Sequence, residues 1–272
     1  MNQQTTSNLL DTELYRSGDS NYMVSLARGL HVIQAFCDGE RSRLTIADIT
    51  RASGLSRTVI SRCLYTLQEL GFVGREGHVY YLLPKVLRLG YGYVSTASLP
   101  ALAQPLLDSL TAETGLASAV IVLDNDEALY VATSRPSSVR NAITINTTIG
   151  HRRPACVTSS GMLLLANLNP ADLNTYFSRL DEDEIVQITS RTETEVRALI
   201  ERAATDGYII SELPFATSMR GLAVPVRNVV DHVVAALVIA IFDTKSSDDD
   251  LAQQYLPKLN KLAKGLTDQL ID

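Results

Sequence analysis

The stretch "SGLSRTVISRCLYTLQELG" (residues 53–71) combines a small-residue turn with a helix that has one apolar side and one basic, hydroxyl-rich side. Gly54 suits the left-handed conformation in which helices often end, and Ser56 is a typical N-cap for the helix that follows. Apolar side chains then recur at i, i+3, i+4 and i+7, the spacing of a buried stripe: Ile60, Cys63, Leu64 and Leu67. The opposite side of this helix is predicted to face solvent or a partner.

The segments around this helix predict a winged helix-turn-helix over residues 22–84. "SLARGLHVIQAF" (25–36) has the spacing of a helix with Ser25 as its N-cap, and "LTIADITRA" (44–52) that of a short second helix. The predicted buried stripe of the first helix is Leu26, Leu30, Ile33 and Phe36. After Gly71, "FVGREGHVYYLL" (72–83) alternates as a two-stranded hairpin around Glu76 and Gly77. Three short helices and a hairpin are typical of this DNA-binding fold.

The charge is divided unevenly between two parts of the chain. The whole chain carries a formal net charge of -6, but residues 22–97 hold nine Lys/Arg against five Asp/Glu, a net of +4. Residues 98–272 hold fourteen against twenty-two, a net of -8. The basic part can therefore meet a polyanion although the chain is acidic.

The outward side of the third helix could be an ordinary solvated face. The turn before it, its spacing and the hairpin after it together favour double-stranded DNA as the partner, because arginines pair with guanine or grip phosphate. The candidate contacts are Ser56, Arg57, Thr58, Ser61, Arg62 and Tyr65.

The rest of the chain predicts a disordered arm, a linker helix and a larger second domain. Residues 1–21 are polar without periodicity, and residues 85–98 have helical spacing weakened by Gly90 and Gly92. In residues 99–272, strands and helices are interspersed, with a strand expected at "NAITINTT" (141–148), and the short links favour an antiparallel sheet with helices packed on it. The predicted fold class is α+β.

Several function classes are disfavoured. The chain has no apolar run of about 18 residues and no secretory signal, so we expect a soluble, cytoplasmic protein without a membrane partner. Its three cysteines and four histidines are scattered, which predicts no disulfide, no metal site and no cofactor. Cys156 lies near His151, but no acid is evident to orient a nucleophilic pair, so we expect no enzyme.

A second candidate site lies in "GHRRPACVTSSGMLLLA" (150–166). There a loop leads into a helix through hydroxyl residues and a glycine, whose hydroxyls and N–H groups can hold a carboxylate: Thr158, Ser159, Ser160 and Gly161. A plain helix-capping segment is the alternative interpretation.

Five of these stretches together resemble the IclR family of bacterial transcriptional regulators: 25–36, 44–73, 83–95, 99–110 and 150–166. More narrowly, "PKVLRLGYGYVSTASLPALAQPLL" (84–107) is similar to the branch that controls protocatechuate and 4-hydroxybenzoate catabolism in the β-ketoadipate pathway. The resemblance runs from about Ser25 to the C-terminus. It implies an N-terminal winged helix on operator DNA, joined to a GAF-like domain (99–272) that binds a small organic acid and forms dimers or dimers of dimers.

The resemblance also implies positions for the effector. Ser159 and Ser160 match two family positions whose backbone N–H groups hold the effector carboxylate, and Arg152 matches the arginine of a G-x-R-x-P motif. Further matches to effector-lining positions are Ser211, Met219, Gly221, Val238 and Ala240. Independently, dimers are expected because one short recognition helix covers only a few base pairs.

The chain departs from the family where the pocket is formed. An acidic run is reduced to Glu212, a glycine is replaced by Ser218, and the last strand is apolar. An anion-binding end with apolar walls suits an aromatic carboxylate such as 4-hydroxybenzoate or protocatechuate, so we expect a regulator of aromatic-acid genes. A tighter core with another ligand, a repressor of another carbon pathway sensing a non-aromatic acid, and an unliganded dimeric DNA-binding protein stay open as alternatives.

Overall fold

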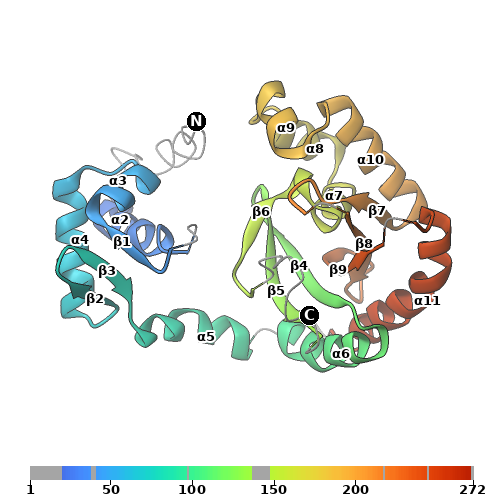
Figure 1. Ribbon diagram of the computed structural model, residues 1–272, viewed down its shortest axis with the longest axis horizontal. Helices are drawn as coiled ribbons and strands as arrows, with labels where there is room; N and C mark the ends of the chain where they lie inside the picture. The colour runs from blue at the N-terminus through green and yellow to red at the C-terminus, as the bar shows by residue number, and fades with distance from the viewer. Residues whose placement is uncertain are drawn as a thin grey trace. The chain divides into compact units, whose positions relative to one another are not determined.

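The computed structural model describes residues 20–37, 41–96, 98–136, 148–216, 218–243 and 245–270. Nearly all of the predicted arm (1–21) and of the strand predicted at 141–148 lies outside these residues. The chain divides into two compact units, residues 1–92 and 93–272 (Figure 1).

The N-terminal unit has the helices and the hairpin of a winged helix-turn-helix. Its elements are α2 (Val24–Gln34), β1 (Arg43–Thr45), α3 (Ile46–Ser53), α4 (Arg57–Glu69), β2 (Val73–Glu76) and β3 (Val79–Leu82). The three strands pair antiparallel in the order β1-β3-β2. All three helices and all three strands contribute to one buried core, which includes Val32, Ile49, Ile60 and Val73.

The first helix differs from the prediction. The N-cap of α2 is Met23, which makes no side-chain cap bond, so Ser25 lies inside the helix. Leu26 and Leu30 are 57% and 49% exposed, whereas Val32 is fully buried. The predicted stripe was wrong in its first half: the buried residues lie in the second half of α2 and just after it, from His31 to Phe36, and burial depends on the packing neighbours rather than on spacing alone.

The strand β1 was also missed, since three residues are too few to show a period. It pairs with β3 from Arg43↔Tyr81 to Thr45↔Val79. Thr45 then begins α3 in a capping box: its hydroxyl accepts from the Asp48 N–H, and the Asp48 carboxylate accepts from the Thr45 N–H at 2.9 Å.

The helix α4 begins and packs as predicted. Gly54 ends α3 with a φ of 66°, and Ser56 is the N-cap of α4. Ile60, Leu64 and Leu67 are buried, while Cys63 is only half-buried. The β2–β3 hairpin follows, with Gly77 at positive φ in its turn.

The predicted linker region is helical but not one helix. A short 3-10 turn (Pro84–Val86) leads into α5 (Leu87–Thr96), and α6 (Ser98–Thr114) follows. The division between the two units falls inside α5, after Gly92. Gly115 ends α6 at a φ of 69°, where a side chain would be strained.

The C-terminal unit has one six-stranded antiparallel sheet, in the order β6-β5-β4-β9-β8-β7. The strands are β4 (Ala117–Asp124), β5 (Glu127–Ser134), β6 (Arg152–Pro154), β7 (Ile209–Glu212), β8 (Met219–Arg227) and β9 (Val233–Phe242). The helices are α7 (Ser159–Leu165), α8 (Pro170–Phe177), α9 (Glu182–Thr189), α10 (Glu193–Asp206) and α11 (Asp248–Thr267). The predicted α+β class is confirmed. Sequence reasoning missed the short elements β6 and α9.

Helices cover both faces of this sheet (Figure 1). On one face α6 and α11 enclose a core of large side chains such as Leu107, Leu222 and Leu259. On the other face α7 to α10 enclose a second core with Ile121, Met162 and Ile200. Because side chains alternate along a strand, neighbouring residues of β4, β8 and β9 serve different cores.

No helix in the described part of the chain is long and apolar enough to cross a membrane.

Candidate DNA-binding surface and small-molecule pocket

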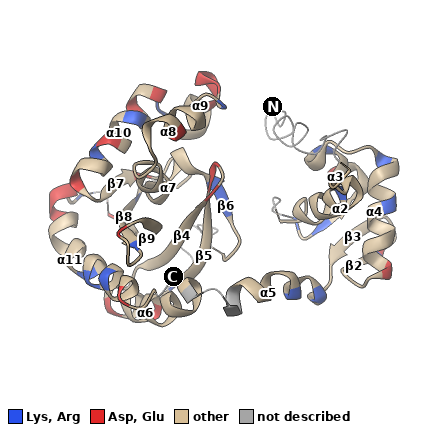
Figure 2. Ribbon diagram, turned by 180° about the vertical axis from the view of Figure 1, so that it is seen from behind, with Lys and Arg blue, Asp and Glu red and all other residues tan. Residues whose placement is uncertain are grey.

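The outward side of α4 presents all the predicted DNA contacts to solvent. Ser56 to Thr58, Ser61 and Arg62 are exposed, and Tyr65 is 66% exposed. Figure 2 shows basic positions along α4. An exposed tyrosine of this size on a helix is a typical contact for a base or a sugar-phosphate backbone.

The two arginines of this surface carry uncompensated charge. Within the described residues, neither Arg57 nor Arg62 makes an ion pair, whereas Arg51 on α3 pairs with Asp48 at 3.4 Å and Arg43 on β1 pairs with Glu76. Guanidinium groups without an internal carboxylate are available for phosphate or guanine.

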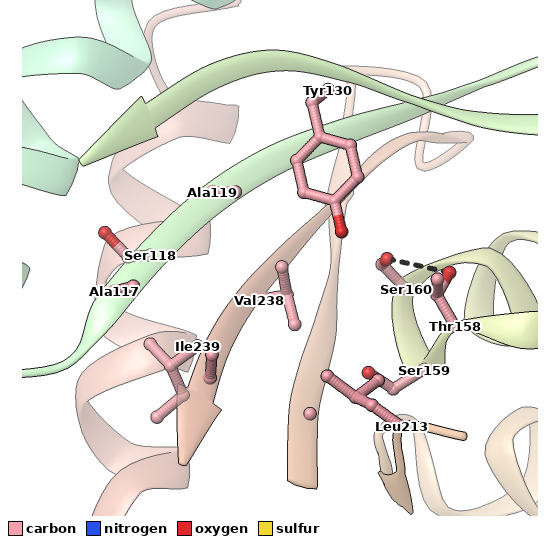
Figure 3. A pocket seen from close by; sticks show the side chains of 12 residues that line it. Ala117, Ser118, Ala119, Tyr130, Thr158, Ser159, Ser160, Leu213, Val238 and Ile239 are labelled. Carbon is pink, nitrogen blue, oxygen red and sulfur yellow. Dashed lines mark hydrogen bonds between the residues drawn. The ribbon is translucent and has the colours of Figure 1, made fainter. Parts of the chain in front are cut away.

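The second unit contains a pocket between the sheet and the start of α7 (Figure 3). The empty space within it is about 380 Å³ when the open solvent at its mouth is included. The residues that line it come from four strands, the β7–β8 loop and α7: Ala117, Ser118, Ala119, Tyr130, Thr158, Ser159, Ser160, Leu213, Gly221, Val238, Ile239 and Ala240.

The pocket exists because small residues of neighbouring strands stand side by side. Ala117 pairs with Ala240, and Ala240 pairs with Gly221, so one row across β4, β9 and β8 has almost no side-chain bulk. At Gly221 a Cβ atom would lie 2.1 Å from the Ser159 hydroxyl oxygen. Glycine at this position therefore lets α7 approach the sheet while the alanines leave room beside it.

Polar groups gather at the α7 end of the pocket. Thr158, Ser159 and Ser160 are only 1–2% exposed. The Thr158 hydroxyl accepts from the Gly161 N–H at 3.0 Å and lies 3.3 Å from the Ser160 hydroxyl. The N–H groups of Ser159 and Ser160 stand in the first helical turn, where no carbonyl four residues earlier can accept from them.

Tyr130 adds a hydroxyl from the opposite wall. Figure 3 shows this hydroxyl directed toward the space between Val238 and Ser160. Tyr130 is 6% exposed, and burial raises the pKa of its hydroxyl, so the group is a neutral donor. The pocket thus combines apolar walls with hydrogen-bond donors that converge near α7.

The structure places six of the ten predicted effector residues on the pocket lining: Thr158, Ser159, Ser160, Gly221, Val238 and Ala240. Ser211 lies beside them, directly opposite Gly221, and its buried hydroxyl has no hydrogen-bond partner among the described residues. Gly161 does not line the pocket; it packs on the backbone of Ala155, where a Cβ atom would lie 2.1 Å from the carbonyl oxygen.

The other two predicted residues lie outside the lining. Arg152 is on the solvent side of β6, where its guanidinium pairs with Asp124 and, at 3.0 Å, with Glu127. Met219 begins β8 opposite Phe242, a residue that is 64% exposed. The two residues miss the pocket for different reasons. Arg152 points to the solvent side of β6, whereas Met219 shares a face of β8 with Gly221 but lies two residues nearer the exposed start of the strand.

Sequence reasoning missed the lining residues of β4 and β5 together with Leu213 and Ile239. The alternation of "ASA" in Ala117, Ser118 and Ala119 was a usable signal for a strand with a small-residue face. Which face it was, and that Ala117 stands beside Ala240, follows only from the pairing of β4 with β9.

Cys156 is a packed core residue. It is 1% exposed, its N–H donates to the Tyr176 hydroxyl at 3.0 Å, and burial raises the pKa of its thiol. A protonated, enclosed thiol is a poor nucleophile. Among the described residues no group of three His, Cys, Asp or Glu side chains is placed to hold a metal ion.

Two family models match most of the chain. Residues 25–77 match the IclR helix-turn-helix domain, and residues 91–267 match the C-terminal domain of bacterial IclR transcriptional regulators. Both are families of transcriptional regulators rather than enzymes.

Curated relatives extend over almost the full length. The Pca regulon regulatory protein of Pseudomonas putida is 35% identical over 93% of this chain and 86% of its own. The p-hydroxybenzoate hydroxylase transcriptional activator of Acinetobacter baylyi is 31% identical over 90% of this chain and 91% of its own.

Solved structures show the same fold. A transcriptional regulator of Rhodococcus sp. RHA1 is 36% identical, with a TM-score of 0.74 over 92% of this chain and 98% of that one. The inducer-binding domain of PobR from Acinetobacter, solved as a double mutant with 3-hydroxybenzoic acid, is 27% identical, with a TM-score of 0.56 over 62% of this chain and 97% of that one.

Proposed function

This chain belongs to the IclR family of bacterial transcriptional regulators, and on that premise we propose that it controls aromatic-acid catabolic genes in response to a small aromatic carboxylate. In this proposal residues 22–84 bind operator DNA, residues 85–98 link the domains, and residues 99–272 bind the effector and form the oligomer. An operator-binding regulator works beside the chromosome, so we place it in the cytoplasm.

The observation that supports this proposal most directly is that one wall of the pocket is apolar and the opposite wall carries polar groups. A flat apolar wall of Ala119, Val238 and Ala240 faces three buried residues, Thr158 to Ser160, whose hydroxyl and N–H groups can hold one carboxylate. An aromatic acid has the matching division: one planar apolar ring and one anionic end. A sugar acid would leave its hydroxyl groups unpaired against the alanine wall, which is costly.

The relatives support this ligand class. One is described as an activator for p-hydroxybenzoate hydroxylase, and the PobR domain was solved with a hydroxybenzoic acid. The preferred effectors are therefore 4-hydroxybenzoate and protocatechuate.

A route from the pocket to the linker is built into β4. Ser118, between the lining residues Ala117 and Ala119, lies 2.8 Å from the Thr111 hydroxyl of α6 and donates to the Leu107 carbonyl at 3.3 Å. The Gln104 amide of α6 also donates to the Thr133 carbonyl of β5 at 3.0 Å. A ligand that displaces β4 would move α6, which follows α5 along the chain. The ligand changes transcription only if it favours one arrangement of the DNA-binding domains in the oligomer.

We further propose that the protein acts as a dimer or a dimer of dimers. In the N-terminal unit, large apolar side chains remain exposed on α2 and α5: Leu26, Leu30, Leu87, Leu89 and Tyr91. Exposed apolar residues of this size commonly mark contacts with a partner. Light scattering of the purified protein tests this, and a monomer at micromolar concentration would contradict it.

Isothermal titration with 4-hydroxybenzoate and with protocatechuate tests the ligand class. Binding by either, together with a rise in melting temperature that grows with ligand concentration, is expected. If neither compound binds but an aliphatic acid such as adipate or pyruvate does, the result would instead support a regulator of another carbon pathway. If none of these acids binds, the result would support an unliganded DNA-binding dimer.

A further inference from the structure

Two adjacent arginines on β6 are in opposite situations. Arg152 is exposed, and two carboxylates, Asp124 and Glu127, neutralise it. Arg153 points to the other side of the strand and is half-buried. Its Nε is buried without a hydrogen-bond partner, and within the described residues it forms no ion pair with a carboxylate.

Strand pairing brings Arg153 beside β5, the strand that supplies Tyr130 to the pocket lining. It stands opposite Ala128 on β5, and Tyr130 follows two residues later on the same face of β5. Diagonal neighbours of this kind have Cα atoms about 7–8 Å apart, within reach of a long side chain. His151, the residue on the other side of Arg152, contacts Tyr130 with ring centroids 5.9 Å apart, and its Nε2 is also buried without a partner.

Phe215, in the β7–β8 loop, holds the guanidinium. The Arg153 Cζ lies 3.7 Å from the centre of the Phe215 ring, a close cation–π contact. The same loop carries Leu213, which lines the pocket. An aromatic face orients the cation and restricts its motion, but it does not neutralise its charge.

A partly buried cation without a counter-charge favours an anion. Arginine remains protonated at any ordinary pH, even though burial lowers the pKa of Arg153. The neutral hydroxyls of Tyr130 and Ser160 supply hydrogen bonds nearby but no charge. Arg153 therefore adds a positive charge on the strand beside Tyr130, and charge together with neutral donors is the combination that a carboxylate needs.

We propose that Arg153 is the cation that recognises the effector's carboxylate, beside the donors of Tyr130 and of Ser159 and Ser160. The inference rests on the proposed function and deepens it: the ligand must be an anion, and the arginine that selects it is Arg153 rather than Arg152. Phe215 positions the guanidinium, and carboxylate binding supplies the counter-charge that the described part of the protein lacks.

The competing role for Arg153 is structural, with the side chain only joining β6 to the β7–β8 loop through Phe215. A structural role affects every ligand equally. A charge-recognition role affects an acid but not its neutral amide, so a matched ligand pair separates the two.

The experiment is isothermal titration of the full chain with 4-hydroxybenzoate and with 4-hydroxybenzamide, which share ring and hydroxyl but differ in charge. In the unaltered protein, we expect the acid to bind at least about tenfold more tightly, the scale of one hydrogen bond to a charged group. Equal affinity for acid and amide would overturn the proposal without requiring any variant.

Arg153→Met, which keeps most of the side-chain length, is expected to lower acid affinity about tenfold or more and to leave amide affinity within about twofold. Arg153→Lys keeps the charge and is expected to retain the preference for the acid. The matched control is Arg152→Met, which removes only exposed ion pairs and leaves both affinities unchanged.

Equal losses for acid and amide in Arg153→Met, or no loss at all, would overturn the proposal. If that variant does not fold by circular dichroism, Arg153→Gln and the acid-to-amide ratio of the unaltered protein decide. Failure of the unaltered protein to bind either compound or protocatechuate would count against the proposed function, a result distinct from binding that ignores Arg153.

Discussion

The helices α4 and α7 begin alike and end up in opposite surroundings. Each starts at a hydroxyl N-cap followed by polar residues: Ser56, Arg57 and Thr58 in one, and Thr158, Ser159 and Ser160 in the other. The first set is exposed, whereas each member of the second is at most 2% exposed. Local sequence gives both helix starts a capacity for anions, and on the proposed function burial decides that α4 meets a DNA backbone and α7 a small acid.

The difference also determines where positive charge comes from. On α4 the arginines belong to the helix itself, since an exposed cation costs little. At α7 the helix start carries only neutral hydroxyls, and the cation that we propose for this site, Arg153, comes from the strand β6, where its guanidinium contacts the Phe215 ring. In a buried site the hydrogen-bond donors and the positive charge can come from different elements, because several elements converge on the site.

The largest expected effect concerns the packing that buries α7. In Gly161→Ala the new Cβ would lie 2.1 Å from the Ala155 carbonyl oxygen and 2.6 Å from its Cα, both backbone atoms. We expect a loss of about 1–3 kcal/mol in the free energy of unfolding, measured by chemical denaturation. Gly265→Ala on α11 is the control, because apart from the backbone of α11 itself no described atom lies within 4 Å of its added Cβ. Equal stability of the two variants would contradict the tight packing of α7.

The exposed helix should respond in DNA affinity rather than in stability. Arg57→Ala and Arg62→Ala are each expected to weaken operator binding about tenfold or more, on the scale of 1–3 kcal/mol per arginine contact. Fluorescence anisotropy with the upstream region of the regulated genes measures this, and circular dichroism confirms the fold. Arg202→Ala, on α10 of the other unit, should leave DNA affinity unchanged. Normal binding by both α4 variants would remove α4 as the recognition surface.

The two N-caps offer a direct test of burial. Thr158→Ala should cost about 2 kcal/mol, since water cannot replace the lost cap on the buried Gly161 N–H. Ser56→Ala should cost only about 0.5 kcal/mol, because its cap bond to Val59 is long at 3.5 Å and the helix start is exposed. Thermal melts of the full chain compare them. A larger loss at Ser56 would reverse the expected order.

The smallest expected effects are those of removing single hydroxyl groups, and they distinguish effector binding from DNA binding. Ser160→Ala removes one hydroxyl of the pocket and should weaken the binding of 4-hydroxybenzoate about two- to tenfold, the value of one neutral hydrogen bond. Ser61→Ala on α4 should leave effector affinity unchanged and lower DNA affinity by a similar factor. Titration calorimetry and anisotropy are run on both variants. If each variant weakened both ligands when they are added separately, the two helices would not have distinct roles.

Many of the local elements were predictable from the sequence, because they depend on residues that are neighbours along the chain. The capping residue Ser56, the left-handed Gly54 and the stripe of Ile60, Leu64 and Leu67 follow from local geometry and a 3.6-residue period. The winged-helix plan and the α+β class follow from the order of such segments. The strands β1 and β6 were missed because three residues show no period. The helix α9 was also missed, although it is as long as the predicted helix α3.

What the sequence determined by itself is the set of local elements, the polar start of α7 and the exposed basic side of α4. What only the tertiary structure decided is which residues meet: Ala117 beside Ala240 beside Gly221, Tyr130 across from Ser160, and Arg153 rather than Arg152 on the less exposed side of β6, opposite Ala128. The physical reason is register. A shift of one residue along a strand reverses the face of every side chain, and register is fixed by pairing between strands far apart in sequence.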